Sequence, residues 1–525
     1  MKNKGVSRLT RTEKTLRNAR YGVACQLVVL LTGFVSRRVI ISYLAAEYLS
    51  VGGLFSNIMT VLSLAELGVG AAITYSLYKP LSEGDEGKIC SLMRLFRRAY
   101  TVIGLSVLAL GCAILPLLRF FVDDIDAALS AVPDFYIIYV LYVVNSSVSY
   151  FLAYKRTLLI ADQRRYVTSI TSSVSQIVLC AAAFLLLGFT MNYVLFMAAT
   201  VFVTAIENVI ISIIARRVYP YLNYKNTQPL EDSEKSTIKT NVKAALMHNI
   251  GGVLVNGTDN IIISRFVSFL AEGLYTNFHL ISAAADSLLR PVFQSATASF
   301  GDLSVEADNE KKTVVFHRMF FAGAWLYGLC AICIANLSLP TVTLWLGEEF
   351  GIDTFSIMLV ALNFYLVGMR RPGMSAREAM GLLRYDRWKS IIEAVLNIIL
   401  SVILAKNLGI AGVLLGTTIS SLSTCFWIEP LVLFRHGLGH GLGKYFARYG
   451  IYSLVTGAAF AATYLICDAI SVGGIGGLLI KGLVCLTVTN LLYVIAYFKF
   501  DEFKYFYKLL LSKIKKPSNK SASEK

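Results

Sequence analysis

Two versions of one short sequence, Gly53-Leu54-Phe55-Ser56-Asn57 and Gly273-Leu274-Tyr275-Thr276-Asn277, occur in the two halves of this chain. Each version stands in the same setting. An apolar segment with charged residues precedes it, namely Arg37-Arg38-Val39-Ile40-Ile41-Ser42 in the first copy and Asp259-Asn260-Ile261-Ile262-Ile263-Ser264 in the second. A further charge and a helix-breaking residue follow it, namely Glu66 with Gly68 and Gly70, and Asp286 with Arg290-Pro291. The chain therefore repeats one charged, kinked hairpin of apolar segments.

The composition places the chain in a lipid bilayer. Hydrophobic residues make up 56% and charged residues 16% of its 525 residues, and its mean hydropathy is +0.63. This is more apolar surface than the core of a soluble protein can bury. We predict an all-α polytopic membrane protein with about fourteen spans, since about 20 apolar residues are needed for one helix to cross the hydrocarbon. The predicted spans are 21–43, 51–78, 99–119, 135–154, 167–188, 193–215, 244–265, 273–300, 319–346, 354–380, 390–406, 409–434, 450–468 and 475–498.

The positive charges are concentrated on one side of these spans. All but seven of the 49 Lys and Arg residues lie in the terminal segments, or in and beside the loops that follow even-numbered spans. The opposite side carries acidic groups instead, among them Asp123, Asp124 and Glu348. By the positive-inside rule, this asymmetry predicts that both termini are cytoplasmic. It also explains the net charge of +16 without a nucleic-acid-binding function. Basic residues that are spread over short loops suit anionic membrane lipids and form no groove that could bind a nucleic acid.

The repeat also predicts the domain organisation. Weaker correspondences continue in the same order beyond the hairpin, so spans one to six and seven to twelve are expected to be copies of one bundle. Because six is an even number of crossings, both copies enter the membrane in the same direction, and their pseudo-twofold axis should run along the membrane normal. The predicted parts are two pseudo-symmetric six-helix bundles, 1–218 and 244–435, a cytoplasmic linker, 219–243, an additional helix pair, 436–498, and a basic cytoplasmic tail, 499–525.

Ionisable groups inside the apolar spans mark the candidate site. An uncompensated charge costs roughly 2.5–3.5 kcal/mol at the centre of a membrane helix, so such groups usually line a substrate path. Glycine or proline breaks at matching positions of two repeats are typical of the central site of a transporter. The candidate substrate-binding residues are Arg37, Arg38, Arg290, Arg370 and Arg371, and the candidate cavity or ion-coupling carboxylates are Glu66, Asp259 and Asp286.

Two interpretations of these charges stay open. Arginine suits an anionic substrate, because its planar group donates two hydrogen bonds at once to phosphate oxygens. However, Asp286 and Arg290 lie four residues apart on one helix face and can neutralise each other, and either arginine of the first copy can pair with Asp259. A buried carboxyl group such as Glu66 can carry a coupling proton or bind sodium, or it can hold an arginine in place.

The first hairpin also resembles a known family. The sequences that carry the resemblance are Glu47-Tyr48-Leu49, Leu62-Ser63-Leu64-Ala65-Glu66-Leu67-Gly68-Val69-Gly70, Tyr75-Ser76-Leu77-Tyr78-Lys79-Pro80-Leu81, Ala161-Asp162-Gln163 and the two pentapeptides quoted above. They are similar to the polysaccharide-biosynthesis exporters, the O-antigen, capsule and exopolysaccharide flippases of the multidrug/oligosaccharidyl-lipid/polysaccharide exporter superfamily. Many of these members have twelve helices. The additional pair is similar to the fourteen-helix members, which include the flippases of the peptidoglycan lipid precursor.

The resemblance implies a function. It implies that an undecaprenyl-diphosphate-linked oligosaccharide, a polyprenyl-diphosphate glycolipid, moves from the inner to the outer leaflet of a bacterial plasma membrane by alternating access, with membrane lipids and glycan-assembly proteins as partners. A cation-coupled drug or metabolite exporter of the same superfamily is the alternative, and a membrane glycan polymerase or ligase is a third. Enzymes of that third class usually carry a long outer loop, whereas the predicted outer loop Phe120–Asp134 is short. The energy source is open between a proton or sodium gradient and the membrane potential.

Sequence motifs typical of enzymes are either incomplete or explained by topology. Asp124-Ile125-Asp126 imitates the metal-binding DxD of glycosyltransferases, but the predicted topology places it outside the cell. The segment from His436 to Lys444 resembles a glycine-rich phosphate loop without satisfying the spacing GxxxxGK[ST]. Cys330 and Cys333 lie in an apolar span without a second pair, which favours packing over metal binding. We therefore predict no enzyme activity, no metal and no cofactor.

Overall fold

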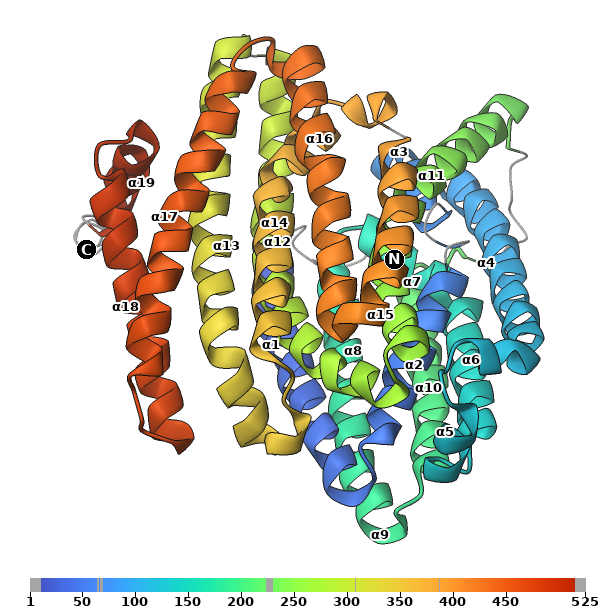
Figure 1. Cartoon of the computed structure of the whole chain (residues 1–525). Coiled ribbons are helices and arrows are strands. Elements are labelled where there is room, and N and C mark those ends of the chain that lie inside the picture. The colour runs from blue at the N-terminus through green and yellow to red at the C-terminus, as the bar shows by residue number, and fades with distance from the viewer. Residues whose placement is uncertain are drawn as a thin grey trace, which may run out of the picture. The chain divides into compact units, whose positions relative to one another are not determined.

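In a computed structural model the chain is almost entirely helical (Figure 1). The structure describes residues 11–63, 66, 69–222, 230–306, 308–386 and 388–514, and none of these lies in a β-strand. The all-α fold predicted from the composition is therefore confirmed. The α-helices are α1 (Arg11–Tyr43), α2 (Glu47–Leu62), α3 (Val69–Glu83), α4 (Glu86–Ile114), α5 (Ile125–Ala131), α6 (Phe135–Phe151), α7 (Ala153–Ala161), α8 (Arg165–Ala182), α9 (Gly188–Thr190), α10 (Tyr193–Val218), α11 (Asp232–Phe266), α12 (Phe269–Glu306), α13 (Asn309–Trp345), α14 (Thr354–Ala379), α15 (Lys389–Ser423), α16 (Cys425–Leu433), α17 (Leu442–Asp468), α18 (Gly474–Tyr497) and α19 (Asp501–Ile514).

Short polar side chains set the start of five helices. Each accepts a hydrogen bond, at 2.8–3.0 Å, from the backbone N–H three residues further on. Such an N-cap satisfies one of the N–H groups that the first helical turn leaves unpaired. The capping residues are Asp85, Asp124, Asn192, Asp308 and Asp353, at the starts of α4, α5, α10, α13 and α14.

Helical residues occupy each of the predicted spans. Within the described residues, eight helical segments are long and apolar enough to cross a membrane, or up to nine if α5 and α6, which meet at 87°, form one span. The segment Lys389–Leu438 counts once, although it covers the predicted spans 390–406 and 409–434. Gly409 separates these two, because its φ of 58° and ψ of −134° lie outside the helical range. The count of fourteen stays a prediction, since four predicted spans that contain charged residues are not among the eight: 51–78, 244–265, 273–300 and 354–380.

The two copies of the hairpin differ where the sequence predicts a kink. In the first copy the helix is interrupted, because α2 ends at Leu62 and α3 begins only at Val69. In the second copy α12 continues as one helix through Pro291. Gly68 of the predicted first kink lies outside the described residues.

The first compact unit comprises Met1–Thr276 and Ser390–Val413. Within it α1 packs against α8, α4 packs against α6, and α11 packs against α2 and α3. Phe55 of α2 lies in a buried apolar cluster and makes edge-on contacts with Phe135 and Tyr139, with ring centroids 4.9 and 5.1 Å away. This packing brings α11, from the second hairpin, against α2, from the first.

The second compact unit comprises Asn277–Lys389 and Leu414–Lys525. Here α13 packs against α14, α17 and α18, and α17 lies beside α18 (Figure 1). Aromatic rings fill these contacts: Phe320 of α13 lies 4.8 Å from Tyr445 of α17, and Trp325 lies 5.2 Å from Tyr493 of α18. The helix pair that follows the predicted repeat is thus attached through α13.

Large apolar side chains are exposed on many helix faces. Phe189 of α9 is 86% exposed, and Leu454 and Leu465 of α17 are 76% and 70% exposed. Monomeric soluble proteins rarely expose apolar patches of such extent, whereas hydrocarbon covers them without cost in a bilayer. The fold is therefore that of a multi-pass membrane protein.

Candidate functional site

The two hairpins cross at their matching glycines within the first unit. A Cβ atom at Gly53 of α2 would overlap the carboxyl group of Glu272, and one at Gly273 of α12 would overlap Ser50 Oγ. Small residues at a helix crossing let the two backbones approach closely. Packing therefore explains the glycine that begins each repeated pentapeptide, since its missing side chain leaves room for a side chain from the other copy.

Glu272 is fully buried at this crossing. Its Oε1 accepts a hydrogen bond from Thr276 Oγ1 at 2.9 Å, while its Oε2 has no hydrogen-bond partner among the described residues. Arg37 of α1 interacts electrostatically with Glu272 and donates from Nη2 to the carbonyl oxygen of Gly273 at 3.4 Å. Sequence reasoning selected Arg37 but missed Glu272, although its position directly before the repeated glycine could have revealed it.

Two tyrosines also lie near Arg37. The hydroxyl groups of Tyr142 and Tyr193 lie 3.4 Å apart, and both rings interact electrostatically with Arg37. The next arginine along the chain, Arg38, is exposed, so the structure separates the two adjacent cations. Asp259 is buried near Tyr275. Its predicted pairing with one of the two arginines stays a prediction.

Glu66 lies in the interruption between α2 and α3. Its backbone N–H donates to the carbonyl oxygen of Ser63 at 2.9 Å, and its own carbonyl oxygen accepts from Val69 at 2.9 Å, which shapes the turn. The carboxyl group interacts with Tyr150 and Tyr100 of the same unit. Among the described residues, tyrosine hydroxyls are therefore the polar groups beside this carboxyl group.

Asp286 is the centre of a charged cluster in the second unit. Its Oδ2 accepts hydrogen bonds from Arg371 Nη2 at 2.8 Å and from Arg290 Nε at 3.1 Å, and its Oδ1 accepts one from the hydroxyl of Tyr327 at 2.9 Å. The predicted pairing of Asp286 with Arg290 is therefore present, but it holds a second arginine as well. One carboxylate balances only one of two guanidinium groups, and Nε of Arg371 is buried without a hydrogen-bond partner in the described chain. The cluster therefore retains positive charge and unused donors.

Arg370 points into a different network. Its Nη2 and Nε donate to the two carboxyl oxygens of Glu429 of α16 at 2.8 and 3.2 Å, and its Nη1 donates to Ser421 at 3.2 Å. Glu429 also forms ion pairs with Arg377, at 3.1 Å, and with Lys389. Asp386 also pairs with Arg377 and Lys389, so two carboxylates hold three cations in a mostly buried network. Adjacent arginines thus differ: Arg370 belongs to a buried ion network and Arg371 to the cluster around Asp286.

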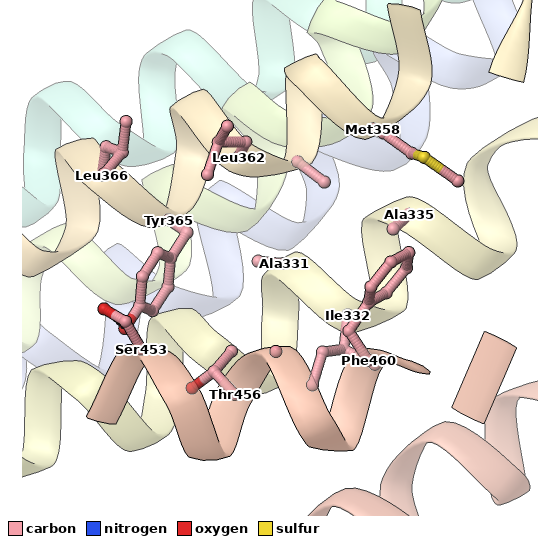
Figure 2. A pocket seen from close by; sticks show the side chains of 12 residues that line it. Ala331, Ile332, Ala335, Met358, Leu362, Tyr365, Leu366, Ser453, Thr456 and Phe460 are labelled. Atoms are coloured by element: carbon pink, nitrogen blue, oxygen red, sulfur yellow. Dashed lines mark hydrogen bonds between the residues drawn. The ribbon is translucent and has the colours of Figure 1, made fainter. Parts of the chain in front are cut away.

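An apolar cavity lies on α13, α14 and α17 of the same unit. It has a volume of about 390 Å³, and Figure 2 shows its lining of small and apolar side chains, including Ala331, Leu362 and Phe460. The hydroxyl groups of Tyr365 and Ser453 meet at one end, 3.1 Å apart. Along α13 and α14 this lining begins about one turn, roughly 6 Å, from residues of the Asp286 cluster. The second unit therefore offers a charged cluster and an apolar cavity on the same two helices.

The Ala161-Asp162-Gln163 sequence has a structural role outside the membrane spans. Oδ2 of Asp162 accepts hydrogen bonds from Arg164 Nε and from the hydroxyl of Tyr219, each at 2.8 Å. Gln163 has a positive φ of 58°, and its carbonyl oxygen accepts from Asn18 of α1 at 2.8 Å. Burial, and then the carboxylate of Asp162, raise the pKa of Tyr219 well above its usual value. This sequence therefore joins the turn between α7 and α8 to the end of α10 and to α1.

Comparison with known proteins gives a fold but no close relative. No family model matches the chain, and no curated protein sequence matches it. Among solved structures, the lipid II flippase MurJ in an inward closed conformation is 13% identical, with a TM-score of 0.64 over 94% of this chain and 99% of that chain. An inward-facing multidrug resistance MATE family transporter of the MOP superfamily is 14% identical, with a TM-score of 0.60 over 79% of this chain and 96% of that chain. A mutant of the Vibrio cholerae MATE transporter VcmN is 12% identical, with a TM-score of 0.58 over 83% of this chain and all of that chain. The chain thus has the fold of proteins that are transporters or flippases and not enzymes.

Proposed function

We propose that this protein is a flippase of the MOP superfamily that moves an undecaprenyl-diphosphate-linked oligosaccharide across the bacterial plasma membrane. The glycan would be a unit of O-antigen, capsule or exopolysaccharide. The observation that carries the proposal is the cluster of Arg290, Arg371 and Asp286, in which two guanidinium groups share one carboxylate. Its excess of positive charge suits a diphosphate.

The geometry of the cluster supports phosphate binding by arginine. Arg290 has a side chain that is 51% exposed and is bound to Asp286 along only one edge, so its remaining donors are accessible. Guanidinium groups bind phosphate oxygens in pairs and stay charged when they lose water. We propose Arg290 and Arg371 as contacts of the diphosphate in the second unit, and Arg37 and Arg38 as further candidate contacts in the first unit. Arg370 would instead stabilise the helices through Glu429.

The apolar cavity supports a substrate with a hydrocarbon tail. A prenyl chain needs a dry surface, and the lining from α13, α14 and α17 is almost free of polar atoms apart from Tyr365, Ser453 and Thr456 (Figure 2). A cavity of this size accommodates part of such a chain and leaves the remainder in the bilayer. In this proposal the diphosphate and the tail of one lipid engage the second unit together.

The transport cycle we propose is alternating access without nucleotide hydrolysis. The two six-helix bundles, 1–218 and 244–435, would rock against each other, with the linker 219–243, both termini and the basic tail in the cytoplasm. Opening toward the outside would separate the hairpins where Gly53 and Gly273 cross. Partners would be membrane lipids and the glycan-assembly proteins that supply and remove the lipid.

A cation-coupled exporter of the same superfamily is the second candidate function. Two carboxyl groups favour this function: Glu66, which lies beside tyrosines, and Glu272, which is deeply buried. A buried carboxyl group can exchange a proton with the transported solute. MATE transporters also share this fold, over a smaller part of the chain than MurJ does. Under this reading the substrate is a soluble organic cation and the arginines play no part in its binding.

Reconstituted liposomes distinguish these functions. We expect the purified protein to move a prenyl-diphosphate oligosaccharide between leaflets without ATP, and mass spectrometry should recover the lipid unchanged. The Arg371→Ala variant in the same liposomes tests whether the Asp286 cluster is needed for this movement. Efflux of a cationic dye without movement of the lipid would replace the flippase with the exporter, and a lengthened, cleaved or transferred glycan would contradict both.

A further inference from the structure

We propose that a second, polar cavity of the second unit is a binding site for a phosphate-bearing anion. The cavity has a volume of about 590 Å³. It is bordered by the start of α13, the turn Leu438–His440, the first two turns of α17 and the start of α19. None of the residues proposed above to contact the transported lipid lines it, so this site goes beyond the transport function.

The glycine-rich turn supplies one side of the cavity. Gly439 and Gly441 have φ of +85° and +108°, conformations that side-chain-bearing residues rarely adopt. α17 begins directly afterwards, and its N-cap residue is glycine, so no side chain caps the first turn. The N–H groups of Gly439 and His440 already donate to the carbonyl oxygens of Phe434 and Leu438, so the donors left for an anion are those of the first turn of α17. The segment lacks the spacing of a phosphate loop, yet the structure gives it the same combination of glycine turn and helix start.

A buried histidine provides an independent sign of a ligand. His317 of α13 lines the cavity and is only 4% exposed. Neither Nδ1 nor Nε2 has a hydrogen-bond partner within the described residues. Buried polar atoms are almost always paired in folded proteins, so an imidazole with two unpaired nitrogens requires an explanation. A phosphate oxygen in the cavity would accept a hydrogen bond from one of them.

The charges around the cavity favour an anion on one side only. Lys444 and Arg318 border it, and the guanidinium group of Arg318 is held over the ring of Tyr505 at 3.8 Å. Lys444 forms no ion pair with any described residue. The acidic Glu502 is neutralised by Arg448 at 2.7 Å. The ligand should therefore lie between His317, Lys444 and the turn of α17.

Two further carboxylates oppose such a ligand. Glu310 and Asp501 line the cavity and are exposed, and each belongs to the first turn of its helix. Their repulsion predicts the sign of a charge substitution. Removing either carboxylate should strengthen the binding of an anion, whereas a site for a cation would be weakened by the same change.

The phosphate can have two sources. In the predicted topology the start of α17 lies at the cytoplasmic face, where soluble phosphates and the headgroups of anionic lipids both reach it. The two share the same chemistry, a phosphate group with oxygens that accept several hydrogen bonds at once. Only the remainder of the molecule differs, and the experiment separates them on that basis.

Two binding measurements on the full-length protein test the site. The first titrates inorganic phosphate into nanodiscs of pure phosphatidylcholine and follows heat release. The second compares the melting temperature in discs with and without phosphatidylglycerol, and native mass spectrometry counts the bound lipid. We expect binding in at least one measurement; phosphate binding in neutral discs would identify a soluble ligand, and binding of phosphatidylglycerol alone would identify a headgroup. Binding in neither measurement would overturn the proposal.

Variants decide whether the signal comes from this cavity. Lys444→Ala is expected to weaken binding at least tenfold, while Arg435→Ala, which removes an exposed cation that does not line the cavity, should leave it unchanged. Glu310→Gln should strengthen binding severalfold. His317→Phe should lose binding yet raise the melting temperature of the ligand-free protein, because it replaces unpaired buried nitrogens by an apolar ring. Equal weakening by Lys444→Ala and Arg435→Ala would contradict the assignment.

Discussion

Gly53 of α2 lies directly against the carboxyl group of Glu272 of α12, and this contact joins the two copies of the repeated hairpin within the first unit. The carboxyl group is fully buried and needs the space that a missing Cβ leaves. Because Gly273 receives Ser50 in the same way, the matching glycines of the two copies form one crossing.

Substitution of Gly53 by alanine should therefore be costly. The added methyl group would overlap the Glu272 carboxyl group, and overpacking of this kind destabilises a protein by about 1–3 kcal/mol. Thermal unfolding in detergent would measure the loss. Gly52→Ala is the control, since its Cβ would meet Tyr142 at an ordinary 3.4 Å. The double variant Gly53→Ala/Glu272→Ala should recover part of the stability; a loss equal to the sum of the single variants would show that the two residues are not coupled.

The adjacent arginines Arg370 and Arg371 are predicted to behave differently. Arg371→Ala should reduce lipid transport at least tenfold while the protein is inserted at normal levels, because it removes a cation from the Asp286 cluster. Arg370→Ala should instead lower the amount of folded protein, since Glu429 and Ser421 lose its hydrogen bonds, at a cost of about 1.5–3 kcal/mol. Arg371→Lys should restore transport in part, because the charge survives without the paired donors. Immunoblots of membranes and transport in liposomes measure the two effects. Normal transport by Arg371→Ala would remove this residue from the substrate path.

The coupling ion can be assigned by two glutamine substitutions. If the carboxyl group of Glu66 carries a proton, Glu66→Gln should abolish the dependence of transport on a proton gradient, and if Glu272 carries it, Glu272→Gln should do so. Both side chains keep their shape in this change, so a purely structural role predicts an unchanged dependence. Transport in liposomes with an imposed pH gradient, and separately with a sodium gradient, measures the outcome. Retained dependence in both variants would point to the membrane potential.

The hydrogen bond from Tyr219 to Asp162 should stabilise the protein at neutral and moderately alkaline pH. Tyr219→Phe is expected to lower the free energy of unfolding by about 1–2 kcal/mol, because it leaves the Asp162 carboxylate with one fewer donor. Since the folded pKa of Tyr219 is raised, this contribution is constant below the ordinary tyrosine pKa of about 10 and is lost only as the pH rises through the higher folded value. Melting temperatures of both proteins between pH 7 and pH 9 should therefore differ by a constant amount, and a difference that disappears in this range would contradict the assignment.

The orientation in the membrane is open to direct test. Reporter fusions after Phe120 and after Tyr221 should report opposite sides, with Tyr221 in the cytoplasm, because the positive charges follow even-numbered spans. A fusion after Val472, in the turn between α17 and α18, should report the same side as Phe120. Fusions at Phe120 and Tyr221 on one side would refute the predicted alternation.

Hydropathy and repetition alone were sufficient to determine the class of the fold. Apolar segments longer than a bilayer is thick can only form helices, because hydrocarbon offers no partner for backbone polar groups. The repeated pentapeptides identified two related hairpins, and the charges inside them identified Arg37, Asp286 and Arg290 as unusual. All of these features depend on residues that are near one another along the chain.

Tertiary structure alone decided which charges meet. Arg370 and Arg371 are neighbours in sequence, yet consecutive residues on a helix point about 100° apart, so one reaches Glu429 and the other Asp286. Nothing near Arg37 in sequence indicates Glu272, because their contact depends on how α1 and α2 pack against the start of α12. The cavities depend likewise on side chains from three or more helices. The pairing of charged side chains and the formation of cavities are properties of the packed helices, and they cannot be predicted from the sequence of one helix.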